Sequence, residues 1–498
     1  MLNLRGMKRV CIIGGGTAGW FAALRLRQIF NESVEIAVIS APEIPIVGVG
    51  EGGVINLLDL LDKLQIDLPT FIQHTGSTLK LGFRYEQWNT GQRDDNFYHL
   101  FADTSSTEMW EDNGFYPFLS LLLNNHIDIN CYMKALELSE RRAETAEALK
   151  LLMAGNSNFT ASLHFDTFRV GKYLKSIALS RGIVHIEEKV EDFNLHVESG
   201  FVTSIKLTEK EIECNFVIDA SGFSRVLIGK KYNIPWKSFA DTLIMNRALP
   251  FHLKHDQQIE LVTRATALSS GWVWQIPLQE RIGAGYVFND QFLSDDQAFN
   301  EVQKWLGKEI NPANVIKFEA GYYEKVWVNN VVALGLASGF VEPLEATSIG
   351  QMITQLETLS NFILHNHGVI SQHTIDYFNQ QNGQYWNGLG DFIRMHYDTK
   401  RSDTPFWKHM KHVPISLAYQ ELRECWKHRT PRLIDFAQYS MSGTLMFGVP
   451  NWLAVGVGVG LIKPEVTAAE LVSLSDDNKQ RLVKNLHDLK VKKSQPAV

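Results

Sequence analysis

The sequence predicts an α/β protein built around a Rossmann-like sheet that binds a dinucleotide. A strand–turn–helix–strand unit of about 30 residues opens the chain. Two later segments, 215–221 and 330–338, read as buried strands that end in small residues. The chain has 498 residues, of which 45% are hydrophobic and 21% charged, which is typical of a globular protein. This length allows two or three interlocked lobes.

The opening unit carries a nucleotide-binding signature. Segments 9–13, 20–29 and 34–40 are predicted as strand, helix and strand, and the turn between the first two reads GGGTAG. Its glycines fit the pattern GxGxxG, which lets the backbone approach a pyrophosphate whose charge lies at the helix N-terminus. The turn therefore predicts a dinucleotide site formed by Gly14, Gly16, Thr17, Ala18 and Gly19.

The second strand ends in a residue that is unusual for such a site. An acidic side chain that binds the ribose is expected about 20 residues after the glycines. Ser40 stands near this position, and the nearest acid is Glu43, further along the loop. A serine hydroxyl can bind a ribose hydroxyl without charge, so Ser40 is predicted to contact the cofactor.

The two later strands favour FAD over NAD. FAD-dependent proteins return to one flavin with strands that are separated in the sequence, whereas NAD dehydrogenases usually complete their site within one continuous domain. Segment 201–208 and the strand around Trp272 alternate in polarity and predict a second sheet beside the flavin domain.

Helices are predicted for the remaining periodic segments. We expect a discontinuous FAD-binding module in residues 1–365, with an inserted sheet and helices. A mostly helical substrate-pocket region, residues 366–498, is expected to pack on it. The predicted helices span 128–153, 168–181, 351–365, 377–397 and 468–493.

Composition argues against several other classes. The net charge of −7 gives no basic surface for nucleic acid. The four cysteines form no CxxC pair and the sixteen histidines show no HExxH spacing, so we predict no metal site and a reducing compartment. The apolar run 452–462 is shorter than the about 20 residues that span a bilayer. We therefore expect a cytoplasmic protein without a membrane partner.

The stretch GWVWQIPL, residues 271–278, places two tryptophans and a proline on one short segment. As a strand it would direct Trp272, Trp274 and Ile276 to one face. Taken alone, it is most simply interpreted as a core strand that ends at Pro277.

Together, the motifs GGGTAGW and WVWQIP resemble the signatures GxGxxG and WxWxIP of the flavin-dependent tryptophan halogenases. The second signature is rare in other flavoproteins. Further segments resemble family segments in the family's order, so the resemblance extends to about residue 460; these segments are IPIVGVGEGG, TLKLGFRYEQW, FVIDASGFSR, GFVEPLEATSI and DTPFW.

The resemblance implies an enzyme that uses reduced FAD, oxygen and chloride or bromide to make hypohalous acid. This oxidant would pass through a tunnel to a separate aromatic pocket. Lys80 matches the lysine that holds or captures it, because an ammonium can polarise the oxidant and a neutral amine can form an N-halo adduct. Glu345 matches the second essential residue, which orients the halogen, stabilises positive charge on the ring or accepts the ring proton.

The resemblance also assigns a halide site and a barrier. Thr347 and Ser348 match the halide-binding residues. Many tryptophan-specific members have glycine in place of Ser348, and we expect a changed halide pocket, because serine adopts positive φ less readily. The barrier that keeps the substrate from the flavin matches Trp272, Trp274, Ile276 and Pro277. Further flavin-binding positions implied are Gly50, Glu51, Val190, Asp219, Leu334, Gly335 and Ile349.

The substrate is less constrained. Members that halogenate free tryptophan clamp its amino and carboxylate groups partly with a Tyr-Tyr pair. The corresponding stretch here, PNWLAVG (450–456), has no such pair and contains a glycine. We expect a more open pocket for indole, a simple indole derivative or another electron-rich aromatic; tryptophan-containing and carrier-bound substrates stay open.

Two other interpretations stay open at this point. An FAD-dependent aromatic monooxygenase would share the flavin elements without requiring Lys80, Glu345 and the WxWxIP wall together. A flavoprotein that binds FAD only for structure or sensing would give no product. Because the sequence shows no second nucleotide site, we expect a separate NAD(P)H-dependent flavin reductase as partner, and a homodimer is compatible with the sequence.

Overall fold

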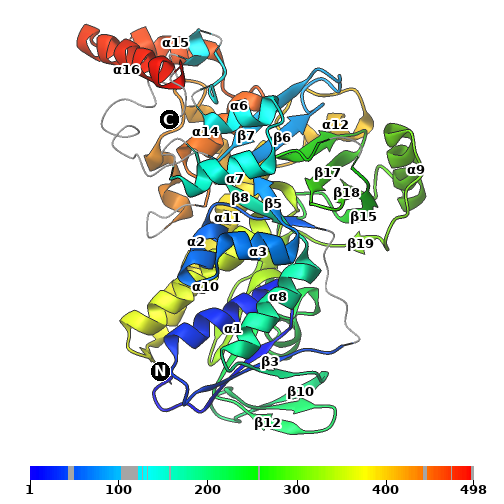
Figure 1. Ribbon diagram of the computed structural model, residues 1–498, viewed down its shortest axis with the longest axis vertical. Coiled ribbons are helices and arrows are strands. Elements are labelled where there is room, and N and C mark those ends of the chain that lie inside the picture. Colours follow the sequence, from blue (N-terminus) through cyan, green and yellow to red (C-terminus); the bar gives the residue numbers. More distant parts are fainter. Residues whose placement is uncertain are drawn as a thin grey trace.

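The computed structural model describes residues 1–42, 50–101, 122–125, 127–131, 133–155, 159–255, 258–440, 446–472 and 474–494. Two regions are distinguished in Figure 1: a lower part with the N-terminus and a mainly parallel sheet, and an upper part with a larger sheet and the C-terminal helices.

The lower part is built on a six-stranded sheet in the order β21-β22-β13-β2-β3-β9. The two later strands predicted from small-residue endings lie directly beside the first strand: β13 pairs with β2 in parallel, and β22 pairs with β13. The predicted return of these strands to the nucleotide-binding unit is therefore confirmed. The strands span β2 Arg9–Ile13, β3 Glu35–Ile39, β9 Val184–Ile186, β13 Phe216–Asp219, β21 Trp327–Val328 and β22 Val331–Ala333.

Three helices pack together beside this sheet. Helix α1 (Thr17–Ile29) buries its apolar side chains and contacts β2, β3, α8 (Thr167–Ser180) and α10 (Thr347–His365). Helix α8 begins at Asp166, whose carboxylate accepts hydrogen bonds from the backbone N–H groups of Phe168 and Arg169. The predicted helix 351–365 begins four residues earlier than expected, at Thr347.

The upper part is built on a seven-stranded sheet in the order β19-β15-β18-β17-β16-β6-β7. Strand β17 carries the WVWQIP motif and pairs on both edges, with β16 and β18. All seven of its residues are buried, which explains its apolar sequence. The strands span β6 Gly82–Glu86, β7 Asn96–Leu100, β15 Arg247–Leu253, β16 Thr263–Ala267, β17 Gly271–Pro277, β18 Ile282–Phe288 and β19 Ile316–Lys317.

One expectation about the second sheet is wrong. Segment 201–208 forms β11 (Val202–Leu207), but β11 belongs to a three-stranded sheet with β10 (Val190–Leu195) and β12 (Glu211–Glu213) and not to the sheet of β17. Alternating polarity identifies a strand with one solvated face, and it does not identify the strand's partners. The smaller sheets contain β1 Leu2–Asn3, β4 Glu51–Gly52, β5 Thr78–Lys80, β8 Ser162–Phe165, β14 Trp236–Ser238, β20 Gly321–Tyr323, β23 Gly339–Phe340 and β24 Val369–Ile370.

Two long predicted helices are each divided. Segment 128–153 forms α6 and α7, because Arg142 between them adopts a φ of 52° that no helix accommodates. Segment 468–493 contains most of α15 and of α16, and Ser475 accepts a hydrogen bond from the backbone N–H of Asn478 at the start of the second. The remaining helices span α2 Asn56–Lys63, α3 Leu68–Thr75, α6 Lys134–Glu140, α7 Thr145–Met153, α9 Asp295–Leu306, α11 Gln372–Met395, α12 Pro405–Met410, α13 Leu417–Cys425, α14 Val449–Gly458, α15 Pro464–Val472 and α16 Asp476–Ser494.

Short helical turns follow several strands. They span η1 Gly222–Ser224, η2 Val226–Lys231, η3 Gly335–Ala337, η4 Leu344–Ala346 and η5 Leu433–Tyr439. Of these, η3 and η4 lie between β22 and α10 and bring the chain from the nucleotide-binding sheet toward the larger sheet.

Two clusters of the apolar core cross the predicted division at residue 365. One surrounds the six-stranded sheet and also includes Leu453 and Ala454 of α14. A second joins β16 and β17 to α11, α12 and α14, and it is rich in tryptophan. The division into two modules therefore stays a prediction, since apolar packing links both sides.

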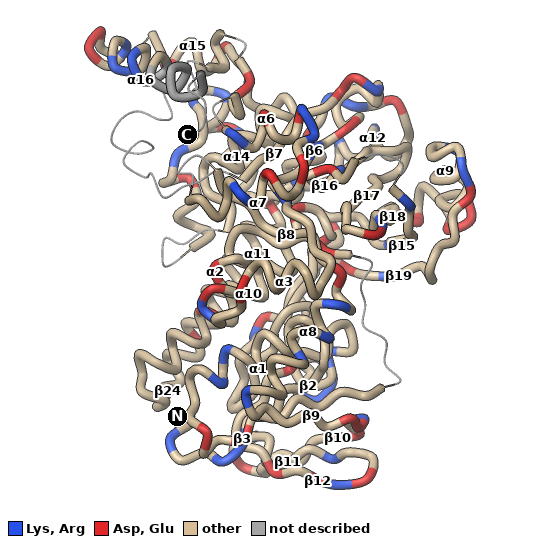
Figure 2. The backbone as a smooth tube through the Cα atoms, viewed as in Figure 1, with Lys and Arg blue, Asp and Glu red and all other residues tan. Residues whose placement is uncertain are grey.

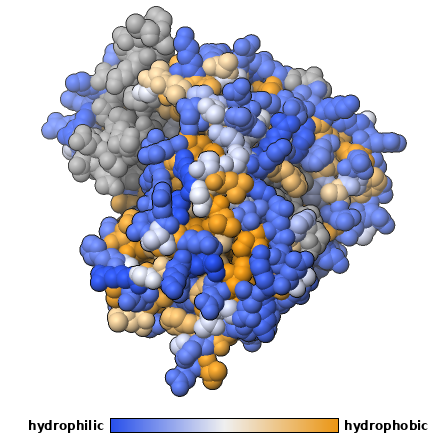
Figure 3. All heavy atoms as spheres, turned by 60° about the horizontal axis from the view of Figure 1, so that its bottom comes forward, coloured by the Kyte–Doolittle hydropathy of each residue, from blue (hydrophilic) through white to orange (hydrophobic). Residues whose placement is uncertain are grey.

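The surface is mixed in character. Figure 2 shows lysine, arginine, aspartate and glutamate interspersed over both parts of the chain. Figure 3 shows a face that is mostly hydrophilic, with apolar side chains gathered near its centre. No helix in the described residues is long and apolar enough to cross a membrane.

Candidate active site

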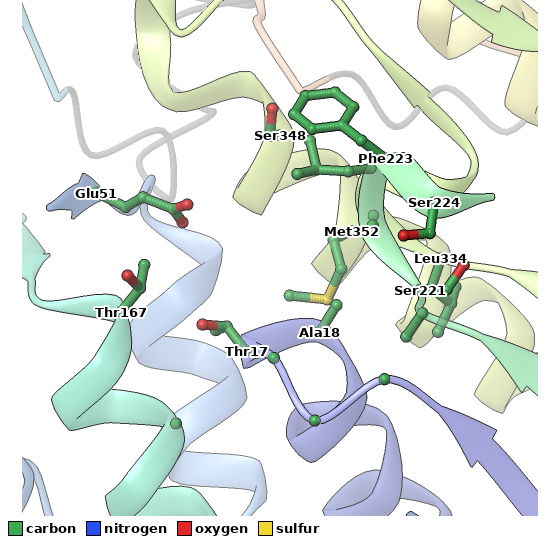
Figure 4. Close-up of a pocket in the computed structure, with 18 of the residues that line it drawn as sticks. Thr17, Ala18, Glu51, Thr167, Ser221, Phe223, Ser224, Leu334, Ser348 and Met352 are labelled. Carbon is green, nitrogen blue, oxygen red and sulfur yellow. The ribbon is translucent and has the colours of Figure 1, made fainter. Parts of the chain in front are cut away.

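A large cavity of about 1230 Å³ connects the glycine turn with the WVWQIP strand. Figure 4 shows part of it: Thr17 and Ala18 stand at the N-terminal end of α1, with Ser348 and Met352 from α10 and Leu334 from the β22 end facing the same space. Glu51 and Thr167 lie on another side. The cavity therefore lies where the carboxyl ends of β2, β13 and β22 meet two helix N-termini, as expected for a nucleotide site in an α/β sheet.

The three glycines of the signature have different physical roles. A Cβ on Gly14, whose φ is 116°, would come within 2.2 Å of the Ala220 carbonyl oxygen. A Cβ on Gly19 would come within 1.9 Å of the Gly14 oxygen. Gly16 is different, because a Cβ there would meet no atom within 4 Å and would extend into open space. Gly14 and Gly19 thus permit close packing, while Gly16 keeps the N-terminus of α1 accessible.

Ser40 lies on the cavity wall at the end of β3. Its hydroxyl is 2.9 Å from Nε2 of His185, which comes from β9. A Cβ on Gly15 would approach the Ser40 hydroxyl to 2.8 Å, so the turn and this serine are in close contact. Glu43 and the segment from Ile44 to Val49 lie outside the described residues.

Most predicted flavin-binding residues line this cavity. They are Gly14, Gly16, Thr17, Ala18, Ser40, Gly50, Glu51, Val190, Leu334, Gly335 and Ile349. Burial raises the pKa of Glu51 to about 7, so at neutral pH this carboxyl group on the cavity wall is protonated in part of the molecules.

Two predicted flavin-binding residues, Gly19 and Asp219, pack beside the cavity and are not among the described residues that line it. Gly19 packs on the turn, as described above. The carboxylate of Asp219 is fully buried and accepts hydrogen bonds from the backbone N–H groups of Leu227 and Ile228 and from the Ser221 hydroxyl. These bonds fix η2 after β13. The cofactor-binding role of Asp219 stays a prediction, and the described lining of the cavity does not include it.

The described residues fit a flavin dinucleotide. The cavity is large enough, the helix N-terminus beyond Gly16 is free of side-chain caps among the described residues, and the far end is lined by apolar and aromatic side chains. A pyrophosphate suits the first end and a flat ring system the second. Among the described residues no group of three or more His, Cys, Asp or Glu side chains could hold a metal ion.

Strand β17 forms one wall of the same cavity. Trp272, Trp274 and Ile276 line it, and the two indole rings meet edge to face with centroids 6.3 Å apart. The Trp274 ring lies against Gly285 of β18, where a Cβ would come within 2.1 Å of the ring. Pro277, in contrast, contributes to a smaller, separate pocket of about 260 Å³ on the other side. The alternation along the strand thus places both tryptophans toward the cavity.

Lys80 is the fully buried last residue of β5 and lines the cavity. Its Nζ donates to the Gly53 carbonyl oxygen at 2.9 Å and lies 3.8 Å from the centroid of the Phe83 ring. Burial lowers the pKa of Lys80 to about 7, an effect that the negative charge of Glu345 opposes. The side chain can therefore exist as an ammonium or as a neutral amine near neutral pH.

Glu345 is fully buried between the two parts of the chain. Its Oε1 accepts a hydrogen bond from the Tyr85 hydroxyl and contacts Nδ1 of His99 at 2.7 Å and Nε2 of His396 at 3.1 Å. Its Oε2 has no hydrogen-bond partner among the described residues. Burial raises the pKa of Glu345, but the two histidines outweigh burial and hold this pKa well below its usual range.

The backbone at Glu345 is strained. Glu345 and Ala346 adopt φ values of 63° and 56°, a region that costs non-glycine residues about 1–3 kcal/mol each. These positive φ values precede Ser348, and the expected change of the halide pocket at this serine stays a prediction. Ser348 lies inside α10, because the reversal is completed two residues earlier and the helix begins at Thr347. Thr347 and Ser348 both line the cavity at the N-terminus of this helix.

The C-terminal stretch 450–456 lies in α14 and beside Glu345's partners. Asn451 Nδ2 contacts Nε2 of His99 at 2.9 Å, and Trp452 stacks on Tyr439 within the aromatic cluster. The glycines of this helix do not widen a pocket as expected. A Cβ on Gly456 would come within 2.8 Å of Ile462, and one on Gly458 within 2.2 Å of the Phe97 ring, so they permit close packing.

Sequence reasoning missed the three residues that hold Glu345. Tyr85, His99 and His396 come from β6, β7 and the end of α11, and all are buried. The sequence offers one signal for such residues: a polar side chain on the buried face of an otherwise apolar strand or helix needs a hydrogen-bond partner. That signal does not reveal a shared partner, because His99 and Glu345 are 246 positions apart.

The chain resembles known proteins over nearly its whole length. The family model described as tryptophan halogenase matches residues 9–474. The protein y4xG of Sinorhizobium fredii is 37% identical over 97% of this chain and 95% of its own. The tryptophan 6-halogenase SttH of Streptomyces toxytricini is 29% identical over 93% of this chain and 91% of its own.

A solved structure agrees with these matches. Xcc4156, a flavin-dependent halogenase from Xanthomonas campestris, superposes with a TM-score of 0.83 at 27% identity, covering 98% of this chain and 95% of that one. The cavity with its glycine turn, the tryptophan wall and the buried lysine thus occurs in a chain whose sequence and fold match one family throughout. The protein belongs to the tryptophan halogenase family and is a flavin-dependent halogenase.

Proposed function

We propose that the protein uses reduced FAD, oxygen and chloride or bromide to form hypohalous acid, and that Lys80 and Glu345 direct this oxidant onto an indole-type aromatic. The observation that carries the proposal is that Lys80 lines the same cavity as the glycine turn while its charge interacts with Glu345. One lysine thereby connects the flavin end of the cavity with the buried carboxylate.

The cofactor end is assigned from the chain's own residues. Gly16 and the N-terminus of α1 would hold the pyrophosphate, Ser40 a ribose, and the apolar far end the ring system. When bound, reduced FAD supplies the electrons that turn oxygen and halide into hypohalous acid and water. The N-terminal N–H groups of α10, at Thr347 and Ser348, would attract the halide. A separate flavin reductase would supply the reduced cofactor.

The tryptophan wall separates oxidant formation from the substrate. Trp272 and Trp274 are held between two neighbouring strands and packed against Trp88 and Gly285, so they have little freedom to move. A rigid indole wall excludes an aromatic substrate from the flavin end. The smaller hypohalous acid reaches Lys80, whose buried ammonium donates a hydrogen bond to its oxygen.

The transfer step balances through Lys80 and Glu345. The ring's π electrons attack the halogen, the oxygen–halogen bond breaks, and the oxygen leaves as water with a proton from the Lys80 ammonium. The cationic ring is stabilised by the Glu345 carboxylate, and Oε2, which lacks a partner among the described residues, accepts the ring proton. That proton then returns to the Lys80 amine. A pKa of about 7 allows Lys80 both to release and to regain this proton near neutral pH.

The substrate proposal rests on the stretch 450–456. Pro450 and Trp452 are apolar, and the Asn451 amide is already engaged by the Gly448 N–H and by His99. The stretch therefore offers no free group for the ammonium and carboxylate of an amino acid. We propose indole or a simple indole derivative as substrate, although relatives such as SttH are named for tryptophan.

A competition assay tests this substrate. Equal concentrations of indole and free tryptophan are supplied together with bromide and enzymatically regenerated reduced FAD, and products are measured by mass spectrometry. We expect brominated indole in at least about tenfold excess, equivalent to about 1.4 kcal/mol. An excess of bromotryptophan would contradict the indole assignment while leaving the halogenase class intact.

A further inference from the structure

The two histidines that contact Glu345 can be assigned their protons from their other neighbours. Asn451 Oδ1 accepts the backbone N–H of Gly448 at 2.8 Å, which fixes the orientation of the amide. The Asn451 NH₂ group must then donate to Nε2 of His99. That nitrogen is therefore bare, and His99 is neutral with its proton on Nδ1, donated to Glu345.

His396 has the opposite arrangement. Its Nδ1 lies 2.9 Å from the carbonyl oxygen of Phe392, which can only accept, so Nδ1 carries a proton. Its Nε2 lies 3.1 Å from Glu345 Oε1. If Glu345 is ionised, its oxygen can also only accept, and Nε2 must carry a second proton.

The remaining contacts favour the ionised carboxylate. Oε1 already accepts from the Tyr85 hydroxyl and from His99 Nδ1, and two such bonds stabilise the anion over the acid. An isolated buried carboxylate would be very costly. Above about pH 7, where Lys80 is mainly a neutral amine, one positive imidazole beside Glu345 makes the cluster neutral, whereas two would leave an excess charge.

We propose that His396 is a positioning residue held as an imidazolium, whose charge and Nε2 proton fix Oε1 of Glu345 so that Oε2 alone is presented for the reaction. The part of this proposal in which Oε2 takes part in the reaction rests on the proposed function. The protonation assignment rests only on the hydrogen-bond partners of His99, His396 and Glu345.

Other titratable groups surround this pair. Tyr85 comes from β6, His99 from β7 and Lys80 from β5, and Glu342 with Tyr397 lies on the neighbouring loop and helix end. Burial raises the pKa of Glu342 to about 8, so it is mainly uncharged and does not compete for the His396 charge at neutral pH. The aromatic rings of Trp88 and Phe392 meet the His396 ring in edge-to-face contacts.

Neutron diffraction from wild-type crystals exchanged into D₂O at about pH 8 tests the assignment without any variant, at a pH where a free imidazole is neutral. We expect deuterium on both ring nitrogens of His396, on Nδ1 alone of His99, and on neither oxygen of Glu345. A bare nitrogen on His396, or a deuteron on Glu345, would overturn the proposal. This outcome is independent of whether the enzyme halogenates indole.

Kinetics test the positioning role. His396→Gln keeps an N–H donor near the Nε2 position but removes the charge, and we expect kcat for halogenation to fall by about tenfold or more with KM for the aromatic little changed. The pH at which kcat falls on the acidic side of its pH profile (the acid limb) should rise by about one unit or more, because the Glu345 pKa rises when its counter-ion is lost.

The matched control is His99→Asn, which replaces a neutral donor by a neutral donor. It is expected to lower kcat without moving the acid limb. In the Glu345→Gln background, His396→Gln should cause little further loss, since its effect passes through the carboxylate. Equal limb shifts in both histidine variants, or full additivity with Glu345→Gln, would contradict the positioning role. Failure of the wild type to halogenate any aromatic would instead contradict the proposed function.

Discussion

At the scale of single residues, the cost of burying charge determines the properties of Lys80 and Glu345. Lys80 is fully buried beside an aromatic ring and one carbonyl oxygen, and burial lowers its pKa to about 7. Glu345 is buried equally, but its partners keep it charged. The two side chains therefore differ in their resting state near neutral pH: Lys80 can be protonated or neutral, whereas Glu345 rests as the anion and takes a proton only from the strongly acidic cationic ring.

Lys80→Met should stabilise the protein while abolishing halogenation. The folded state pays for the buried ammonium at all pH values below about 7, where folded and unfolded chains are both protonated. As pH rises above 7, the folded state releases its proton first and the cost declines. Urea unfolding at about pH 6 should show a gain of about 1–3 kcal/mol that shrinks at about pH 9. A loss of stability at both pH values would show that Lys80 is not held against a desolvation cost.

At the scale of elements, local sequence patterns were informative and long-range pairings were not. The glycine turn and β17 were predictable because steric limits on the backbone and strand alternation act within a few residues. The break at Arg142 and the separation of β11 from the larger sheet were not predictable, because they depend on which distant strands and helices meet. The same holds for His396, which reaches Glu345 across 51 positions.

The glycine turn offers a direct test of cofactor fit. Gly16→Ala adds a Cβ that meets no protein atom within 4 Å, so the fold should be unaffected. The methyl group enters the space assigned to the pyrophosphate, and FAD affinity measured by fluorescence titration should fall by about tenfold or more. Equal FAD affinity in the variant and the wild type would mean that the pyrophosphate lies elsewhere. Gly14→Ala, which would clash with the Ala220 oxygen, is expected to destabilise the fold itself.

The contact between β17 and β18 can be tested separately. Gly285→Ala places a Cβ within 2.1 Å of the Trp274 ring and should push the indole toward the cavity. We expect a loss of about 1–3 kcal/mol in thermal or urea unfolding, together with weaker FAD binding. Gly383→Ala is the matched control, because its Cβ would make only ordinary contact at 3.5 Å. Similar stability losses in both variants would argue against a packed indole wall.

At the scale of the whole molecule, the larger sheet and the nucleotide-binding sheet meet around one cavity and one carboxylate. The loop from β22 through η3 and η4 to α10 carries Gly335, Glu345 and Thr347 past both sheets. The sequence revealed these residues through their resemblance to one family. The position of Gly335 and Thr347 on the cavity wall, and the histidines that hold Glu345, follow from tertiary packing between segments that are far apart in the chain.

In the proposed reaction, an oxidant made at the flavin is transferred by Lys80. The most direct measurement follows reoxidation of reduced FAD and formation of halogenated aromatic in the same reaction, with bromide present, for the wild type and Lys80→Met. We expect similar flavin reoxidation in both proteins and bromine-containing product, identified by its isotope pattern, from the wild type alone. Bromide-independent hydroxylated product, or equal bromination by Lys80→Met, would contradict it.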